Sequence, residues 1–196
     1  MTRRILLVFA ALVIIAIGLA FYALQLRRKV ARDEQLAAQQ QIAIAPPANG
    51  PSTPVTLYVA SDNNGALTKT EMNAVLPVER SERDRSILRV LLELYLQPQT
   101  SHPIGAGADI RDVYVMGDDT AIVDTNSAFA DAHPSGVLAE ELTVASIVTT
   151  LNANDARIAK VKILVNGQER ETLAGHADLR RFYLASNVGQ ATKDVP

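Results

Sequence analysis

The chain has 196 residues, of which 48% are hydrophobic, and its formal net charge is -2. This near-neutral balance argues against a nucleic-acid partner, as does the lack of a basic cluster interleaved with aromatic side chains. The absence of cysteine excludes disulfides, thiolate nucleophiles, cysteine-ligated zinc and a lipid-modified N-terminal cysteine.

The first predicted element is a transmembrane helix at residues 5–26, ILLVFAALVIIAIGLAFYALQL. A helix of this length measures roughly 33 Å, against a hydrocarbon core of roughly 30 Å. The segment lacks the polar face of a soluble helix, and no small-residue cleavage site follows it. We therefore predict an uncleaved single-pass signal anchor after residues 1–4. The basic residues flanking it slightly favour a cytoplasmic C-terminal domain, so charge alone leaves the orientation open.

Residues 27–54 are predicted to form a stalk and a linker. The stretch RRKVARDEQLAAQQQ is rich in helix formers but has no apolar periodicity, and AIAPPANGPSTP combines proline, glycine and small polar residues. Neither part can bury a core. We expect the folded domain to span residues 55–183, followed by a flexible tail at residues 184–196.

The domain begins with a predicted strand at residues 55–60, closed by a turn at residues 62–65. Ser81 is a candidate helix cap, with Asp84 at the third position of a capping box, and Pro98 stops the helix. The apolar residues of this helix recur at helical spacing: Ile87, Leu88, Leu91, Leu92, Leu94 and Tyr95.

A hairpin is predicted from residues 110–116 and 120–125. A second helix follows and ends near residues 152–155. Its predicted apolar face consists of Leu138, Leu142, Ala145, Val148 and Leu151. Residues 161–165 and 168–173 flank Asn166-Gly167, which suits a type I′ turn and predicts a final hairpin.

These elements give the order β-α-β-β-α-β-β. We therefore predict an α+β domain in which two helices cover one face of a mainly antiparallel sheet. A domain of roughly 130 residues buries enough surface to be stable without a cofactor.

His176 is the first candidate for chemistry, because it lies two residues before Asp178. The two side chains could form an acid–base pair or ligate a metal. Alternatively, they hydrogen-bond local backbone groups where the chain leaves the sheet. Because no nucleophile elbow, HExxH motif or phosphate loop accompanies them, the structural interpretation is favoured.

His133, with Asp131 and Asp124, could hold a divalent cation, but the spacing fits no calcium loop. His102 lies in a glycine-containing loop that lacks the lysine of a P-loop, so we interpret it as part of a connector.

The remaining acidic clusters are also interpreted structurally. Residues 62–65 and Asp118-Asp119 lie where turns are required. Glu140 and Glu141 are adjacent on a helix, where their side chains diverge by about 100°, so they favour the helix dipole and cannot form an acid–base pair. The sequence thus predicts no catalytic, metal or cofactor site.

The element order, the helical segment SIVTTL and above all VKILVNGQERETLAGHADL resemble the GerMN domain, a family named from a sporulation and spore germination protein. The resemblance runs from Val55 to Phe182. It implies an extracytoplasmic, membrane-tethered module without enzymatic activity, similar in fold to ring-building modules, that helps to assemble an envelope structure. The family's sporulation protein has two such domains and a lipoprotein cysteine, whereas this chain has one domain, which favours a general envelope role.

Three functional hypotheses follow. The first is a non-catalytic module in the bacterial cytoplasmic membrane, with its domain extracytoplasmic, that associates with envelope proteins or with itself. The second is a peptidoglycan-binding module, which would need an exposed aromatic platform; tryptophan is absent. The third and most remote is a hydrolase that uses His176 and Asp178.

Overall fold

The computed structural model describes residues 52–191, with side chains through residue 188. The predicted N-terminal segment, transmembrane helix and most of the linker lie outside the described residues and stay predictions. Within residues 52–191, no helix combines the length and the apolar character needed to cross a membrane.

The domain contains ten elements in two sheets. In chain order they are β1 (Ser52–Ser61), β2 (Ala66–Val75), α2 (Arg80–Tyr95), β3 (Ile110–Met116), β4 (Thr120–Thr125), α3 (Ser127–Asp131), α4 (Val137–Asn154), β5 (Lys160–Val165), β6 (Tyr183–Leu184) and α5 (Ala185–Ala191). β1 and β2 form an antiparallel hairpin, and the second sheet has the order β3-β4-β5-β6. Only β4 and β5 run parallel in it.

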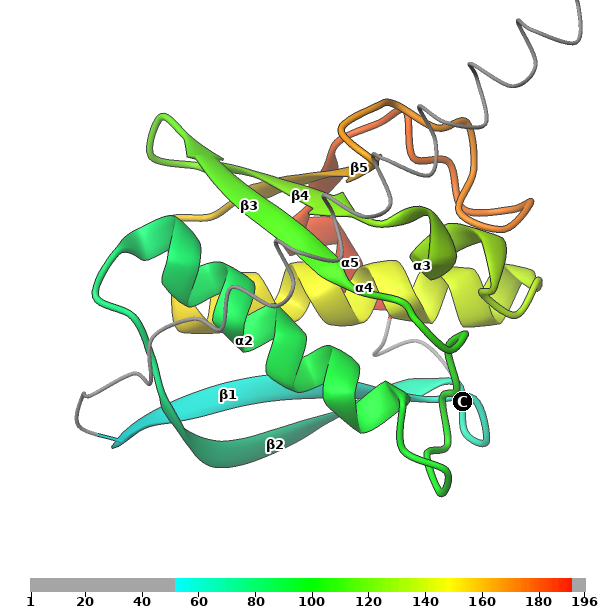
Figure 1. Cartoon of the computed structure of the whole chain (residues 1–196), viewed down its shortest axis with the longest axis horizontal. Helices are drawn as coiled ribbons and strands as arrows, with labels where there is room; N and C mark the ends of the chain where they lie inside the picture. Colours follow the sequence, from blue (N-terminus) through cyan, green and yellow to red (C-terminus); the bar gives the residue numbers. More distant parts are fainter. Residues whose placement is uncertain (1–51, 192–196) are drawn as a thin grey trace, which may run out of the picture. The chain divides into compact units, whose positions relative to one another are not determined.

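The α+β class is confirmed, but the prediction of one sheet with both helices on one face is wrong. α2 and α4 lie between the β1–β2 hairpin and the four-stranded sheet (Figure 1). One core joins the three layers, and its members include Leu57, Leu88, Val123, Val148 and Ile163.

The second strand, β2, was not predicted. Half of its sequence, ALTKTEMNAV, is polar, and six consecutive side chains from Thr68 to Asn73 are exposed. A strand of this kind has almost no hydrophobic alternation, which is the main signal for a strand in a sequence. The turn at residues 62–65 was predicted correctly, and it returns the chain along β1.

The edge of β1 that faces away from β2 is bonded to helix side chains instead of a third strand. On α4, Ser146, Thr150 and Asn154 recur every fourth residue and bond the backbone of Tyr58 and Thr56 at 2.6–3.1 Å. Four helical residues rise about 6.0 Å and two strand residues about 6.6 Å, so the two spacings match. This stripe explains why α4 is buried on nearly every side yet contains polar residues.

The predicted C-terminal ends of α2 and α4 are confirmed. α2 ends before Pro98, and α4 ends at Asn154. The capping box at Ser81 is wrong, because the Glu79 carboxylate accepts hydrogen bonds from the amides of Ser81 and Glu82 at 3.1 and 2.7 Å. Leu138 is 51% exposed, so it does not belong to the buried face of α4.

The predicted final hairpin is only half correct. Asn166 and Gly167 have φ of 52° and 73°, as a type I′ turn requires, and Val165 bridges Gln168. However, no strand follows, and the antiparallel neighbour of β5 is β6. The chain leaves the sheet after Gln168, and the amides of Ala174, His176 and Ala177 bond a side chain of α4.

The C-terminal region also differs from the predicted tail. Residues 185–191 form α5, which packs against α4, and Val188 contacts the core. The amide of Ala185 bonds the carbonyl of Ala159 at 3.0 Å, which fixes the start of this helix beside β5.

Candidate functional site

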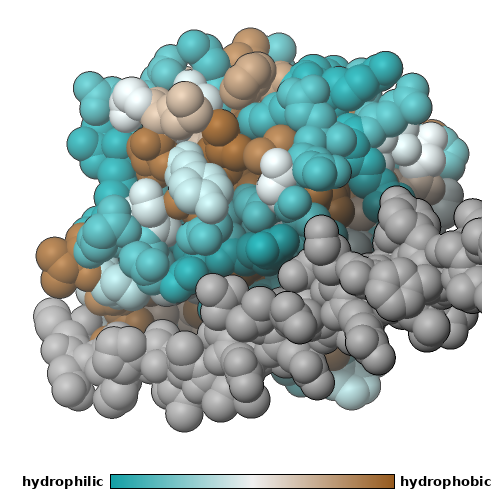
Figure 2. Space-filling model, turned by 45° about the horizontal axis from the view of Figure 1, so that its top comes forward, coloured by the Kyte–Doolittle hydropathy of each residue, from teal (hydrophilic) through white to brown (hydrophobic). Residues whose placement is uncertain are grey.

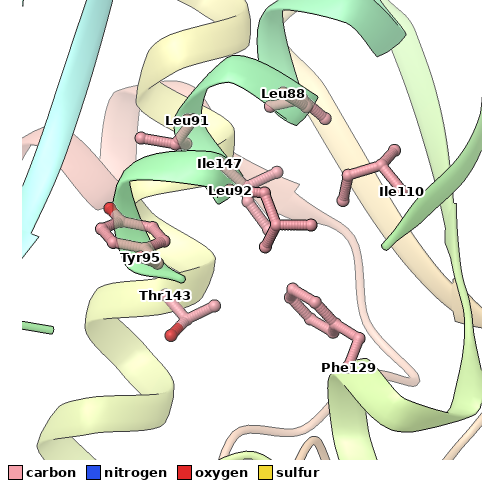
Figure 3. Close-up of a pocket in the computed structure, with 8 residues that line it drawn as sticks. All are labelled: Leu88, Leu91, Leu92, Tyr95, Ile110, Phe129, Thr143 and Ile147. Atoms are coloured by element: carbon pink, nitrogen blue, oxygen red, sulfur yellow. The ribbon is translucent and has the colours of Figure 1, made fainter. Parts of the chain in front are cut away.

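The recess drawn in Figure 3 lies between α2, α4 and α3. Its walls are mainly apolar side chains, and Tyr95 and Thr143 turn their hydroxyls away from it (Figure 3). The cavity has a volume of about 10 Å³, near the lower limit for one water molecule. A substrate therefore cannot enter this recess.

Glu140 makes more hydrogen bonds than any other side chain within residues 52–191. One carboxylate oxygen accepts from the amides of Ala174, His176 and Ala177 at 3.0, 2.8 and 2.9 Å. The other oxygen contacts His176 Nδ1 at 2.8 Å and the amide of Gly136 at 3.2 Å. The side chain is fully buried, and its hydrogen bonds join the start of α4 to the loop after β5.

These hydrogen bonds set the charge of Glu140. Burial alone would raise the pKa of this carboxyl, but the bonds from Ala174, His176 and Ala177 outweigh burial and lower the pKa to about 2. Gly175, with φ of 124°, allows the backbone to curve around the carboxylate. The loop sequence AGHA is thus explained by a buried anion 34 residues earlier in the chain.

His176 and Asp178 do not form the acid–base pair considered above. His176 bonds Glu140, whereas Asp178 accepts from the amide and guanidinium of Arg180 at 2.9 and 3.0 Å. The expected hydrogen bond to a local backbone group is found for Asp178, whereas for the His176 imidazole it is wrong, because the imidazole contacts a distant carboxylate instead. Glu140 is buried and Glu141 is exposed, which agrees with the predicted divergence of the two side chains.

The cluster of His133, Asp131 and Asp124, considered above as a cation site and not favoured, is not assembled. Asp131 pairs with Arg170 at 2.6 Å, and Asp124 accepts from the amide of Gly167 at 2.6 Å. Within residues 52–191, no group of three or more carboxylate or imidazole side chains is placed to hold a metal ion. Asp118 and Asp119 lie in the turn between β3 and β4, as predicted, and the Asp119 carboxylate also pairs with Lys160 at 2.8 Å.

A second buried network joins His102 to His133 through Thr143. The Thr143 hydroxyl lies 2.7 Å from Nε2 of each histidine and 3.1 Å from the carbonyl of Ala139. His102 Nδ1 lies 2.5 Å from the Asp62 carboxylate. Asp62 therefore does more than form a turn, and His102, which is fully buried, does more than connect two elements.

The geometry of this network fixes where its protons lie. His133 Nδ1 faces the carbonyl of Pro134 at 2.8 Å, so it donates, and in the neutral ring Nε2 must accept the Thr143 proton. That hydroxyl has one proton, which His133 Nε2 shares with the carbonyl of Ala139, so His102 Nε2 must donate to the hydroxyl oxygen. His102 Nδ1 in turn forms a hydrogen bond with the Asp62 carboxylate.

The neutral state of His133 agrees with its surroundings. Burial is the main reason that the pKa of His133 lies below its usual value, and the Pro134 carbonyl opposes this only in part. An Asp–His–Thr series could activate a nucleophile only if the hydroxyl reached a substrate. Thr143 is 1% exposed and its hydroxyl lies between two imidazoles, so the network is structural.

Asp84 is the one charged side chain whose burial lacks compensation in the described part of the chain. It is 2% exposed, and its Oδ2 has no hydrogen-bond partner among residues 52–191. Burial, together with the nearby Asp155 carboxylate, raises the pKa of Asp84 to about 6. The Arg80 guanidinium bonds Asp155 at 2.6 Å, so its charge lowers the pKa of Asp84 only in part.

The Asp84→Asn substitution should therefore stabilise the protein above pH 6. Because the pKa of Asp84 is raised from 3.8 to about 6, its ionisation does not affect the free energy of unfolding below pH 3.8. Above pH 6 it lowers the free energy of unfolding by about 3 kcal/mol. We expect a gain of about 1–2 kcal/mol at pH 7.5, because the amide keeps some unpaired polarity, and no gain at pH 3.5. Denaturant unfolding at the two pH values measures this difference. Asp118→Asn, an exposed control, should change neither value, and equal effects of Asp84→Asn at both pH values would refute the assignment.

The outward face of the four-stranded sheet combines apolar side chains with charged ones such as Asp112 and Lys160. The strand register places Tyr114, Ile122 and Lys162 side by side across β3, β4 and β5, and the Phe182 ring lies 5.7 Å from Lys162 Nζ. Tyr114 and Phe182 are 51% and 52% exposed. Figure 2 brings this side of the sheet forward and shows hydrophobic residues gathered among hydrophilic ones. We call Tyr114, Met116, Ile122, Leu164 and Phe182 the outer sheet face.

Comparisons with known proteins agree with this fold. The tandem GerMN domains of the sporulation protein GerM from Bacillus subtilis match with 23% identity and a TM-score of 0.50, over 66% of this chain and 44% of that one. The chain thus spans less than half of that tandem structure. The first GerMN domain alone matches with 21% identity and a TM-score of 0.43, over 65% and 92% of the two chains.

A Clostridium perfringens protein described as a lipoprotein matches with 18% identity and a TM-score of 0.44, over 76% of this chain and 97% of that one. No curated protein matches the sequence. The family model Germane, described as sporulation and spore germination, matches residues 56–171, which is more than half of the chain. The chain therefore belongs to the Germane family, and the predicted GerMN-like domain is confirmed.

Proposed function

We propose that this protein is a non-catalytic module, anchored in the bacterial cytoplasmic membrane by residues 5–26, whose extracytoplasmic domain associates with other envelope proteins. The family membership and the uncharged 22-residue N-terminal stretch support the envelope location. The histidines, which would be the natural acid–base groups, are all engaged in holding the fold together.

The outer sheet face is the observation that carries the proposal. Exposed aromatic and methionine side chains are typical of the centres of protein interfaces. Met116 is 57% exposed and Tyr114, two residues earlier on the same face of β3, is 51% exposed. Large exposed apolar side chains gathered on one sheet mark an interaction surface more often than an inert one.

A photoreactive amino acid placed at Tyr114 in the full chain tests this proposal in living cells. The control carries the same group at Asn63, in the exposed turn after β1. We expect adducts of discrete mass from position 114 that are absent from position 63. Identical adducts from both positions, or none from either with the chain extracted as a free monomer, would contradict the proposal.

Peptidoglycan binding is the second candidate, and the exposed rings of Tyr114 and Phe182 favour it. Aromatic faces stack on sugar rings, and these two rings lie on the same side of the sheet. Saturable retention of the full chain on purified peptidoglycan, lost when both rings are replaced by alanine, would support this function over protein association.

A further inference from the structure

Within residues 52–191, the ten-residue strand β2 pairs with β1 along one edge and with no strand along the other. On β1, the backbone groups of Thr56 and Tyr58 bond α4 side chains, away from β2. The residues of β1 between them, such as Leu57, must therefore bond β2, and Leu57 lies opposite Thr70. Because bonding direction alternates along a strand, Lys69 and Glu71 point their amides and carbonyls outward.

No described residue uses these outward groups. By the same alternation, the free edge consists of the amides and carbonyls of Leu67, Lys69, Glu71 and Asn73, and no hydrogen bond to them is found within residues 52–191. The side chains of Lys69 and Glu71 are 54% and 65% exposed and lie 2.7 Å apart. An edge of this length is a template for another strand.

The charges on this edge select one partner and one register. If a second β2 pairs antiparallel about a two-fold axis at Thr70, Lys69 of each copy faces Glu71 of the other, as hydrogen-bonded pairs. A shift of one step in either direction places Lys69 opposite Lys69, or Glu71 opposite Glu71. Opposite charges across a strand pair stabilise it and like charges destabilise it.

We propose that two copies of this chain associate through their β2 edges, with Thr70 on the two-fold axis, to form one continuous four-stranded sheet β1-β2-β2-β1. The proposal rests on the assembly function proposed above and names one partner and one surface for it. Charged residues usually protect an edge strand from pairing. Here the alternation of Lys69 and Glu71 is self-complementary, so it opposes other registers and permits this one.

The absence of cysteine allows a direct test with the full chain in isolated membranes. Thr70 would face its own copy as a non-hydrogen-bonded pair, with Cα atoms about 4.5 Å apart, which is within the range of a disulfide. Thr70→Cys should therefore form a disulfide-linked dimer under mild oxidation. Thr68→Cys is the matched control, because it would face Met72 and lie about 13 Å from its own copy.

Charge exchange tests the register independently. In the Thr70→Cys background, Lys69→Glu or Glu71→Lys alone should reduce the dimer yield about tenfold, because each places like charges opposite one another at both pairs. The double exchange should restore the yield. A monomeric Thr70→Cys protein, equal dimer yields from Thr68→Cys and Thr70→Cys, or no recovery in the double exchange would each overturn the proposal.

The two proposals fail in different ways. If Thr70→Cys stays monomeric while position 114 still gives photo-adducts, the β2 pairing is wrong and the assembly function stands. If a different protein becomes linked at Thr70→Cys in place of a second copy, the edge is used but the proposed pairing is wrong. If neither position yields any adduct, both proposals fail.

Discussion

The Glu140→Gln substitution is expected to lower the free energy of unfolding by about 3 kcal/mol at pH 7. The carboxylate accepts four backbone amides and contacts the His176 ring, and it is fully buried. A glutamine of the same shape keeps one acceptor oxygen. Its side-chain NH2 group, however, would face backbone N–H groups, and two donors cannot bond each other. Denaturant unfolding monitored by circular dichroism measures the loss.

The same carboxylate predicts how stability depends on pH. Because the pKa of Glu140 is lowered to about 2 from an ordinary value near 4.5, its contribution is complete above about pH 4.5 and is lost as the pH falls toward 2. The Glu140→Gln protein should lack this part of the acid transition. Glu141→Gln, on the adjacent exposed residue, is the control and should behave as the parent protein. Equal losses of stability from the two substitutions would show that the hydrogen bonds of Glu140 do not stabilise the fold.

The second large effect is expected from Thr143→Val. The substitution preserves the shape of the side chain but removes the hydroxyl that lies 2.7 Å from both His102 and His133. Two buried imidazole nitrogens would lose their partner, at about 1–3 kcal/mol each, so we expect a loss of about 3 kcal/mol or more. Thermal unfolding and denaturant unfolding should both report it.

Thr149→Val, on the same helix, provides the matched control. The Thr149 hydroxyl is buried and has no hydrogen-bond partner among the described residues, so its removal should leave stability unchanged or raise it slightly. If the two valine substitutions have the same effect, the histidine network contributes nothing beyond the packing of α4.

The sequence was sufficient to predict the elements that bury a periodic apolar face. The β3–β4 hairpin, α2, α4 and the Asn166-Gly167 turn all depend on local signals such as β-branched residues, helical spacing and turn-forming residues. The same signals could not reveal β2, whose side chains face solvent, or the short β6, whose two residues pair with β5 only after the chain has folded back.

The polar networks could not be predicted because their members are far apart in the sequence. Glu140 bonds residues 34 to 37 positions later, and His102 bonds residues 40 and 41 positions away. One signal was present, because Thr143, Ser146, Thr150 and Asn154 form a polar stripe on an otherwise apolar helix. A stripe of this kind on a buried helix indicates buried hydrogen-bond partners, which are the edge of β1 for Ser146, Thr150 and Asn154 and two histidines for Thr143.

Labelling a single cysteine most directly tests whether the domain lies outside the cytoplasm. Asn63→Cys places one thiol in the exposed turn after β1 of a chain that otherwise has none. In spheroplasts of the native host, a membrane-impermeant maleimide should label this thiol before lysis, and lysis should add little further labelling. Labelling that occurs only after lysis would place the domain in the cytosol and contradict the proposed envelope role.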